Sequence, residues 1–173
     1  MTVSRILPLV LLAALATFLG LNLGRPQQAT VRSAMVGKPA PAFALPGLAG
    51  EPGLRQADLA TGRPVLVNLF ASWCLPCRVE APQLAALRRA GVVIHGIALR
   101  DRPEDVAAFL ARHGNPFGRI GLDADGRVAV GFGSSGVPET FLIDGQGIIR
   151  AQHIGEIRPE DVPKILKELR RWG

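Results

Sequence analysis

The sequence contains no tyrosine, only two cysteines and few other aromatic side chains, and each shortage excludes a class of protein. The 173 residues include seven Phe and two Trp. A net charge of +6 would suit nucleic-acid binding, but the basic residues are scattered and form no stripe interleaved with aromatic side chains, so no nucleic-acid partner is expected. Two cysteines so close together exclude a framework of several disulfides and an all-cysteine zinc site within one chain.

Charged residues are also scarce, at 20% of the chain, and the mean hydropathy of +0.25 excludes a disordered protein. A length of 173 residues suits one domain with an additional anchor or tail, and is too short for two full domains. Residues 26–36 are polar and lack periodicity, so we expect them to form a tether. Residues 37–173 are expected to form the folded domain.

Residues 6–24 contain no charged side chain. As a helix they would span about 28 Å, close to the thickness of a hydrocarbon core. A cleaved signal peptide is the alternative, but its apolar region would be shorter, and the small residues at Ala14 and Ala16 lie inside the apolar run. We expect residues 1–25 to form an uncleaved transmembrane anchor, and under either alternative the rest of the chain crosses the membrane.

Hydrophobic periodicity predicts an α/β domain. Apolar, partly β-branched runs alternate with helical patterns, which indicates a parallel βαβ unit, and a later hairpin adds antiparallel strands. On the first helix Val79, Leu84 and Leu87 recur at helical spacing, and Asp101 is a candidate cap for the second helix. A mixed sheet flanked by helices is therefore expected. The expected elements are an extended piece at 43–45, strands at 65–70 and 92–99, helices at 76–90 and 103–113, hairpin strands at 140–143 and 148–153, and a closing helix at 159–171.

Cys74 and Cys77 stand where a predicted buried strand gives way to a helix. A helix N-terminus offers unpaired N–H groups and the positive end of the helix dipole, and both stabilise a thiolate. Two intervening residues place the second sulfur one turn away, within reach of a disulfide. This spacing predicts that Cys74 is the exposed nucleophile and that Cys77 resolves the mixed disulfide.

Other uses of the pair fit the sequence less well. Half of a metal site would need further ligands, and the three histidines lie in unrelated segments. Haem attachment would require a histidine directly after Cys77, where Arg78 stands instead. A structural disulfide that closes so small a ring would restrict the unfolded chain little. Redox chemistry is favoured, with the cysteine pair as the redox group and no metal or other cofactor expected.

Three stretches carry a family resemblance: GKPAPAFALP (37–46), VNLFASWCLPCRVE (67–80) and GVPETFLID (136–144). Together they resemble the DsbE-type thiol:disulfide interchange proteins of cytochrome c maturation, over roughly residues 36 to 172 and the anchor. The resemblance implies a thioredoxin fold on a single-pass anchor in the bacterial inner membrane, with the catalytic domain in the periplasm.

The resemblance also implies an activity. Members of this family are expected to reduce the cysteine pair of apocytochrome c so that haem can be attached, and to receive electrons from a membrane donor of the thiol-reduction pathway. Two alternatives stay open: a general or copper-centre-assembly thiol reductase of the same fold, and a non-enzymatic copper chaperone.

Several further site residues follow from the resemblance. Pro138 matches the family proline that faces the cysteine pair in the cis form, and the backbone of Val137 is expected to pair with an extended substrate. Trp73, from its position beside Cys74 and not from the resemblance, is most simply interpreted as a shield and docking surface. Glu139, which matches the family, is expected at the substrate-binding site as a second acidic candidate beside Glu80. An exposed role in substrate specificity is the alternative interpretation.

Glu80 is the candidate proton acceptor for Cys77, because it follows three residues later on the same helix face. Thioredoxin has an aspartate in the preceding strand, and Asn68 occupies the matching place here and cannot titrate. The alternative is a solvated glutamate stabilised by the helix dipole.

Overall fold

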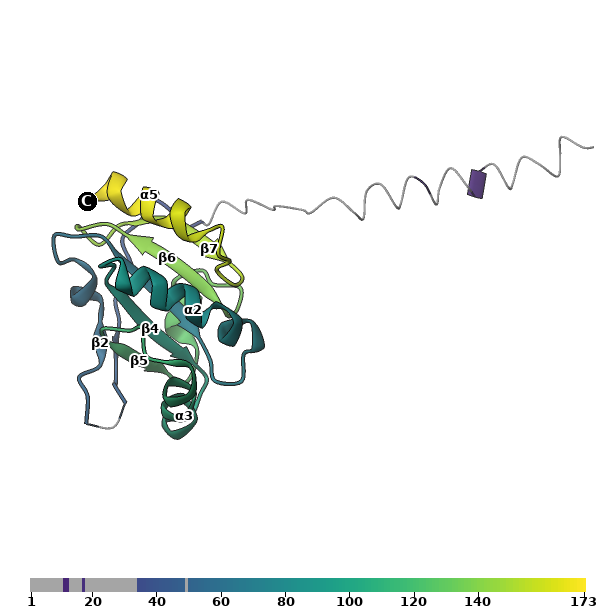
Figure 1. Ribbon diagram of the computed structural model, residues 1–173. Coiled ribbons are helices and arrows are strands. Elements are labelled where there is room, and N and C mark those ends of the chain that lie inside the picture. Colours follow the sequence, from purple (N-terminus) through teal and green to yellow (C-terminus); the bar gives the residue numbers. More distant parts are fainter. Residues whose placement is uncertain (1–10, 13–16, 18–33, 49) are drawn as a thin grey trace, which may run out of the picture. The chain divides into compact units, whose positions relative to one another are not determined.

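The computed structural model describes residues 11–12, 17, 34–48 and 50–173, and residues 1–31 and 32–173 form two separate units (Figure 1). Apart from residues 11, 12 and 17, the predicted anchor at 1–25 lies outside the described residues, and so do residues 26–33 of the predicted tether. Among the residues that are described, no helix is both long enough and apolar enough to cross a membrane.

A five-stranded mixed sheet forms the centre of the folded unit (Figure 1). The middle strand pairs in parallel with one neighbour and antiparallel with the other, which confirms the predicted βαβ unit and added hairpin. The strands, in spatial order, are β5 (Ile120–Asp123), β4 (Ile94–Leu99), β3 (Val65–Phe70), β6 (Glu139–Ile143) and β7 (Ile149–Ile154).

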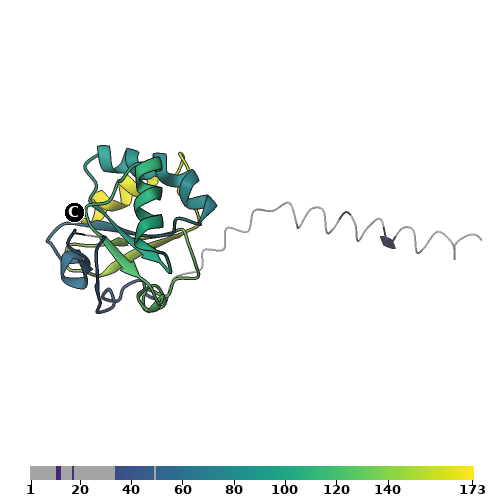
Figure 2. The same cartoon turned by 90° about the horizontal axis from the view of Figure 1, so that it is seen from below.

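Helices α2 (Leu75–Arg89), α3 (Pro103–His113) and α5 (Val162–Trp172) cover one face of this sheet (Figure 2). The opposite face packs against smaller elements. These are β1 (Ala44–Leu45), β2 (Leu54–Arg55), the 3-10 helix η1 (Gln56–Leu59) and α4 (Arg127–Gly131).

β3 lies between two hydrophobic cores, so all six of its residues are buried. Leu66 and Phe70 pack in the core beneath α2, α3 and α5, whereas Val65, Val67 and Leu69 pack in the core on the opposite face. Burial on both faces explains why this strand appears in the sequence as a continuous apolar run without alternation. It also fixes the end of β3, and with it the loop that leads to Cys74.

The structure corrects two local predictions. Val79 does not pack in the core: it is 58% exposed and shares a solvent-facing side of α2 with Leu75, four residues earlier. Asp101 does not cap α3, because the N-cap residue is Arg102 and no side chain caps that helix. The Asp101 carboxylate instead accepts hydrogen bonds from Ser72 and from the backbone N–H of its neighbour Arg102.

Candidate active site

The two cysteines form a disulfide at the start of α2, with their Cα atoms 5.3 Å apart. β3 ends at Phe70 and α2 begins at Leu75, so the pair lies at the carboxyl edge of the sheet. Cys74 is the N-cap residue, and its Sγ accepts the backbone N–H of Cys77 at 3.1 Å. Pro76 fits the first turn, because its missing N–H would have no partner within the helix there.

Both sulfurs are buried in the disulfide form, and this corrects the prediction of an exposed Cys74. Cys74 is 3% exposed and Cys77 is 2% exposed, and both belong to the core beneath α2. Their neighbours Trp73 and Leu75 project into solvent instead. The two sulfurs therefore do not differ in accessibility. They differ in that the Cys74 sulfur accepts a hydrogen bond from the backbone N–H of Cys77.

Glu80 is completely buried, so the alternative of a solvated glutamate is wrong. One carboxylate oxygen accepts the Asn68 amide N–H at 2.9 Å, and the other accepts the backbone N–H of Ile157 at 2.9 Å. Burial raises the pKa of Glu80 to about 7, against the opposing effect of these two hydrogen bonds. The carboxyl group can therefore take up or release a proton near neutral pH.

Glu80 and Cys77 line the same small cavity, together with Asn68. Asn68 also donates to the Thr140 hydroxyl at 3.0 Å, while its own carbonyl oxygen is buried without a partner. Sequence spacing places Glu80 near Cys77, but the role of Asn68 in orienting Glu80 depends on packing between β3 and α2. The arrangement suits transfer of a proton between Cys77 and Glu80.

The peptide bond between Val137 and Pro138 is cis, as the resemblance implies. The β3–β6 register pairs Leu69 with Glu139, which places Pro138 beside the end of β3. Val137 packs against the core cluster that contains both cysteines. The segment before β6 is therefore brought to the same edge of the sheet as the disulfide.

Glu139 is 1% exposed, which contradicts an exposed specificity role for its side chain. One carboxylate oxygen accepts the backbone N–H of Ser135 at 2.9 Å and also its hydroxyl, and the other accepts the Gln152 amide at 2.7 Å. The side chain joins the loop before Pro138 to β7. Its position is close to the predicted substrate edge, but its oxygens are already occupied.

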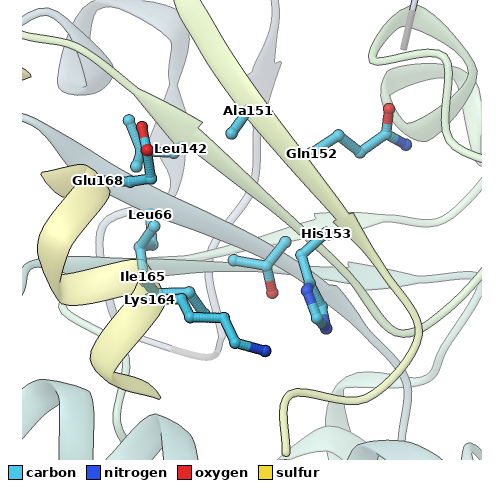
Figure 3. Close-up of a pocket in the computed structure, with 9 residues that line it drawn as sticks. Leu66, Leu142, Ala151, Gln152, His153, Lys164, Ile165 and Glu168 are labelled. Atoms are coloured by element: carbon cyan, nitrogen blue, oxygen red, sulfur yellow. The ribbon is translucent and has the colours of Figure 1, made fainter. Parts of the chain in front are cut away.

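Among the further hollows on the folded unit, two are lined by residues of the elements around the site. One is a polar groove beside the disulfide, lined by Ser72, Trp73, Arg78, Asp101, Asp105, Phe109, Arg112 and His113. The other lies between α5 and strands β6 and β7, with neither cysteine in its lining (Figure 3). Within the described part of the chain, no group of three or more His, Cys, Asp or Glu is arranged to hold a metal ion.

Residues 36–152 match the AhpC/TSA family. Among curated proteins, the chain is 44% identical over 154 residues to the thiol:disulfide interchange protein DsbE of Pseudomonas fluorescens biotype C, covering 88% of this chain and 84% of that protein. It is 40% identical over 137 residues to the thiol:disulfide interchange protein HelX of Rhodobacter capsulatus, covering 79% and 78%. It is 37% identical over 169 residues to DsbE of Escherichia coli K12, covering 95% and 91%.

Solved structures agree with this similarity. A thiol:disulfide interchange protein of the thioredoxin family from Chlorobium tepidum superposes with a TM-score of 0.63 at 28% identity, covering 76% of this chain and 94% of that one. The thioredoxin-like fold of the folded unit is thereby confirmed. With its Cys74–Cys77 disulfide at a helix start, the chain belongs to the AhpC/TSA family and is a thiol:disulfide interchange protein of the DsbE type.

Proposed function

We propose that this protein is a membrane-anchored periplasmic reductant for the cysteine pairs of apocytochrome c. The observation that carries the proposal is a Cys74–Cys77 disulfide beside a buried carboxyl group, Glu80, whose pKa lies near neutrality. The family resemblance supplies the substrate, because it extends beyond the cysteines to the segment around Pro138.

The reaction proceeds in two exchanges. The Cys74 thiolate attacks one sulfur of the substrate disulfide, so a mixed disulfide forms and one substrate thiolate leaves. The Cys77 thiolate then attacks the Cys74 sulfur, so the Cys74–Cys77 disulfide forms and the second substrate thiolate leaves. Two electrons pass to the substrate, and a membrane-located thiol donor returns the protein to its dithiol form.

The thiolates of the two cysteines depend on different groups during the two exchanges. The Cys77 N–H at the start of α2 stabilises negative charge on the Cys74 sulfur, which favours Cys74 as the attacking thiolate. Cys77 has no such donor in the described contacts, and Glu80 accepts its proton before the second exchange. Asn68 and the Ile157 N–H hold the Glu80 carboxylate for this step.

Substrate binding uses the edge of the sheet around the cis proline. Val137 precedes β6, so its backbone is available to pair with an extended substrate segment. We expect the exposed Trp73, next to Cys74 in the chain, to shield the approach to Cys74. Glu139 contributes indirectly, because it fixes the loop before Pro138 through Ser135.

The direction of electron flow is inferred from the motif itself. Leu75 and Pro76 place no titratable group between the cysteines, and Pro76 removes one N–H donor. Weaker stabilisation of the thiolate makes a pair less oxidising. In the oxidising periplasm such a pair, held at the membrane by residues 1–25, would reopen disulfides that form in exported apocytochromes.

The test is the level of c-type cytochromes in a strain that carries Cys74→Ala or Cys77→Ala in place of the native protein. We expect haem-stained c-type cytochromes to be lost while other haem proteins stay at their normal level. An added small thiol should restore them, because it supplies the same electrons without recognition. Normal c-type cytochromes in the Cys74→Ala strain, with no second reductase present, would instead favour a general or copper-centre-assembly thiol reductase.

A further inference from the structure

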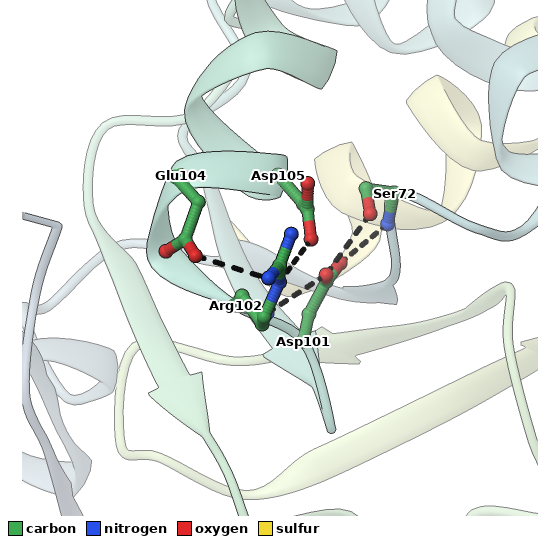
Figure 4. A network of polar contacts seen from close by, with 5 residues as sticks. All are labelled: Ser72, Asp101, Arg102, Glu104 and Asp105. Carbon is green, nitrogen blue, oxygen red and sulfur yellow. Dashed lines mark hydrogen bonds and ion pairs between the residues drawn. The ribbon is translucent and has the colours of Figure 1, made fainter.

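Ser72, two residues before Cys74, has three polar groups in hydrogen bonds, and Figure 4 shows the two that reach Asp101. Its backbone N–H donates to one Asp101 carboxylate oxygen at 2.5 Å, and its hydroxyl donates to the other at 2.9 Å. Its carbonyl oxygen accepts the Arg78 guanidinium at 3.2 Å. The loop between β3 and α2 is thus fixed by a residue that lies 29 positions further along the chain.

The backbone around Asp101 is shaped for this contact. Arg100 has φ of +47°, a left-handed conformation that is uncommon for residues other than glycine, and its N–H donates to the Asp123 carbonyl at 2.9 Å. Such conformations persist where the surrounding structure enforces them, and they are frequent at functional sites. The turn at Arg100 follows the end of β4, which lies parallel to β3, so Asp101 reaches the carboxyl end of its neighbour.

We infer that Asp101 is a positioning residue for the thiol–disulfide exchange at Cys74, acting through Ser72. No described hydrogen bond joins Asp101 or Ser72 to either cysteine side chain, so Asp101 acts on the loop and not on the sulfurs. This inference rests on the proposed role of Cys74 as the attacking sulfur.

Exchange is sensitive to the position of this loop for two reasons. Cys74 is almost fully buried in the disulfide form, so a small shift of residues 72–74 changes how a substrate sulfur reaches it. The backbone N–H of Cys77 also donates a hydrogen bond to the Cys74 sulfur at 3.1 Å, and displacement of the loop weakens that hydrogen bond. A displacement of about 1 Å at a reacting group can cost up to about a hundredfold in rate.

The inference is tested on the full-length reduced chain in detergent, mixed with a peptide whose Cys-x-x-Cys-His segment is closed by a disulfide. Asp101→Asn replaces a carboxylate that accepts two hydrogen bonds from Ser72 and one from the backbone N–H of Arg102 with an amide that can accept only through its single oxygen. We expect the rate constant for exchange to fall by about tenfold. We also expect the pH profile of Cys74 alkylation to shift to higher pH, which a general loss of stability would not cause.

Asp105→Asn is the matched control, because Asp105 lines the same groove but pairs with Arg102 at 2.7 Å and has no described contact with Ser72 (Figure 4). It should leave the rate and the profile unchanged. Ser72→Ala should slow exchange less than Asp101→Asn, because the backbone contact remains, and Ser72→Thr should restore the rate. The double variant should be as slow as Asp101→Asn alone, since Ser72→Ala removes a contact that Asp101→Asn already disturbs.

Three results would overturn the inference: a rate for Asp101→Asn equal to that of the unmodified chain, an equal slowing by Asp105→Asn, or a Ser72→Ala variant with an unchanged rate. If circular dichroism shows that Asp101→Asn does not fold, the comparison of Ser72→Ala with Ser72→Thr decides. Cys74→Ser separates this inference from the proposed function. Exchange that survives Cys74→Ser contradicts the proposed function, whereas exchange lost in Cys74→Ser but normal in Asp101→Asn contradicts only the positioning role.

Discussion

The burial and the raised pKa of Glu80 can be predicted only in part from the sequence. Its spacing from Cys77 indicates a shared helix face, but a glutamate in the first turns of a helix is usually solvated. Complete burial changes this, because desolvation penalises the charged carboxylate and raises its pKa to about 7. A group with this pKa is suited to acid–base work at neutral pH, at a cost to stability that can be measured.

The first prediction concerns that cost. The pKa of Glu80 is about 7 in the folded chain and 4.5 when unperturbed, so folding favours the protonated form. The contribution of protonated Glu80 to the free energy of unfolding is fully present below pH 4.5. It is lost as the pH rises through 7, which lowers the free energy of unfolding by about 3 kcal/mol. In urea unfolding of the oxidised chain, the free energy of unfolding should fall between pH 5 and pH 8. Glu80→Gln should flatten this dependence, while the exposed Glu160→Gln should retain it; equal pH curves for both variants would contradict the burial argument.

A second prediction separates the two exchanges. If Glu80 accepts the proton of Cys77, Glu80→Gln should slow the second exchange and leave the first unchanged. Acid-quenched time courses with a disulfide peptide should then show the mixed disulfide of Cys74 accumulating in Glu80→Gln, but not in Glu160→Gln. Equal decay of the mixed disulfide in both variants between pH 6 and 9 would remove Glu80 from the mechanism.

A third prediction addresses the two sulfurs. Cys74 receives an N–H group at the start of α2, so its thiolate should form at lower pH than that of Cys77. Iodoacetamide at neutral pH should therefore label Cys74 first in the reduced chain, as peptide mass spectrometry would show. Cys77→Ser should keep this fast labelling and Cys74→Ser should lose it. Preferential labelling of Cys77 would reverse the assignment.

At the scale of elements, the sequence predicts those whose pattern is long and periodic. β3, α2 and α3 lie within a residue or two of their expected bounds. The sequence does not predict β5 and α4, because segments of four and five residues carry too little hydrophobic periodicity. Tertiary contacts sustain them: β5 pairs with β4, and the Asp123 carboxylate accepts the N–H of Ala129 at 2.8 Å in α4.

The site, too, has features that the sequence predicts and contacts that depend on tertiary packing. The cysteines, the cis proline and the position of Glu80 follow from local spacing or from the family resemblance. The contacts that hold them do not, because Ile157 lies 77 residues from Glu80 and Asp101 lies 29 residues from Ser72. For Glu139 the sequence suggests a side chain that faces the substrate, because the residue is acidic and close to the site. This prediction is wrong, because packing between β6 and β7 buries the side chain.

A fourth prediction concerns the β6–β7 hairpin. The buried Asp144 accepts the backbone N–H groups of Gln146 and Ile148, each at 2.9 Å, and pairs with Arg150 at 2.6 Å. The Arg150 guanidinium in turn lies over the Trp172 ring of α5, 4.3 Å from its centroid. The hairpin and the closing helix are therefore joined through one carboxylate.

Asp144→Asn replaces an acceptor with a donor on one side of this arrangement and leaves the Arg150 charge without its partner. We expect a loss of about 1–3 kcal/mol in the free energy of unfolding, together with a change in Trp172 fluorescence. Asp125→Asn breaks an exposed ion pair with Arg127 and keeps an oxygen that can accept the Arg127 backbone N–H, so it should cost less than about 1 kcal/mol. Equal losses in the two variants would show that the hairpin contact contributes no more than a surface ion pair.

For the whole molecule, the groups with chemical roles gather at one edge of the sheet. The parallel strands β3 and β4 bring the cysteine loop and Asp101 to their shared carboxyl end, and the antiparallel β6 begins at that end with the cis proline before it. This mixed topology explains how segments around residues 74, 101 and 138 form one site. The closing helix α5 contributes Leu169 to the core cluster that contains both cysteines.

The last prediction concerns how this unit is held in the cell. Residues 6–24 are uncharged and long enough to cross the membrane as one helix. Because the positively charged Arg5 precedes them, we predict that residues 1–5 lie in the cytoplasm and the domain lies outside. A phosphatase that is active only in the periplasm, fused after Arg32, should be active and should remain with the membrane fraction. Replacing Leu12 and Leu15 with arginine should abolish its activity, because two charges at the centre of the span oppose insertion. An inactive fusion with the native span would refute the orientation, and an active fusion released as a soluble protein would show that the segment is cleaved.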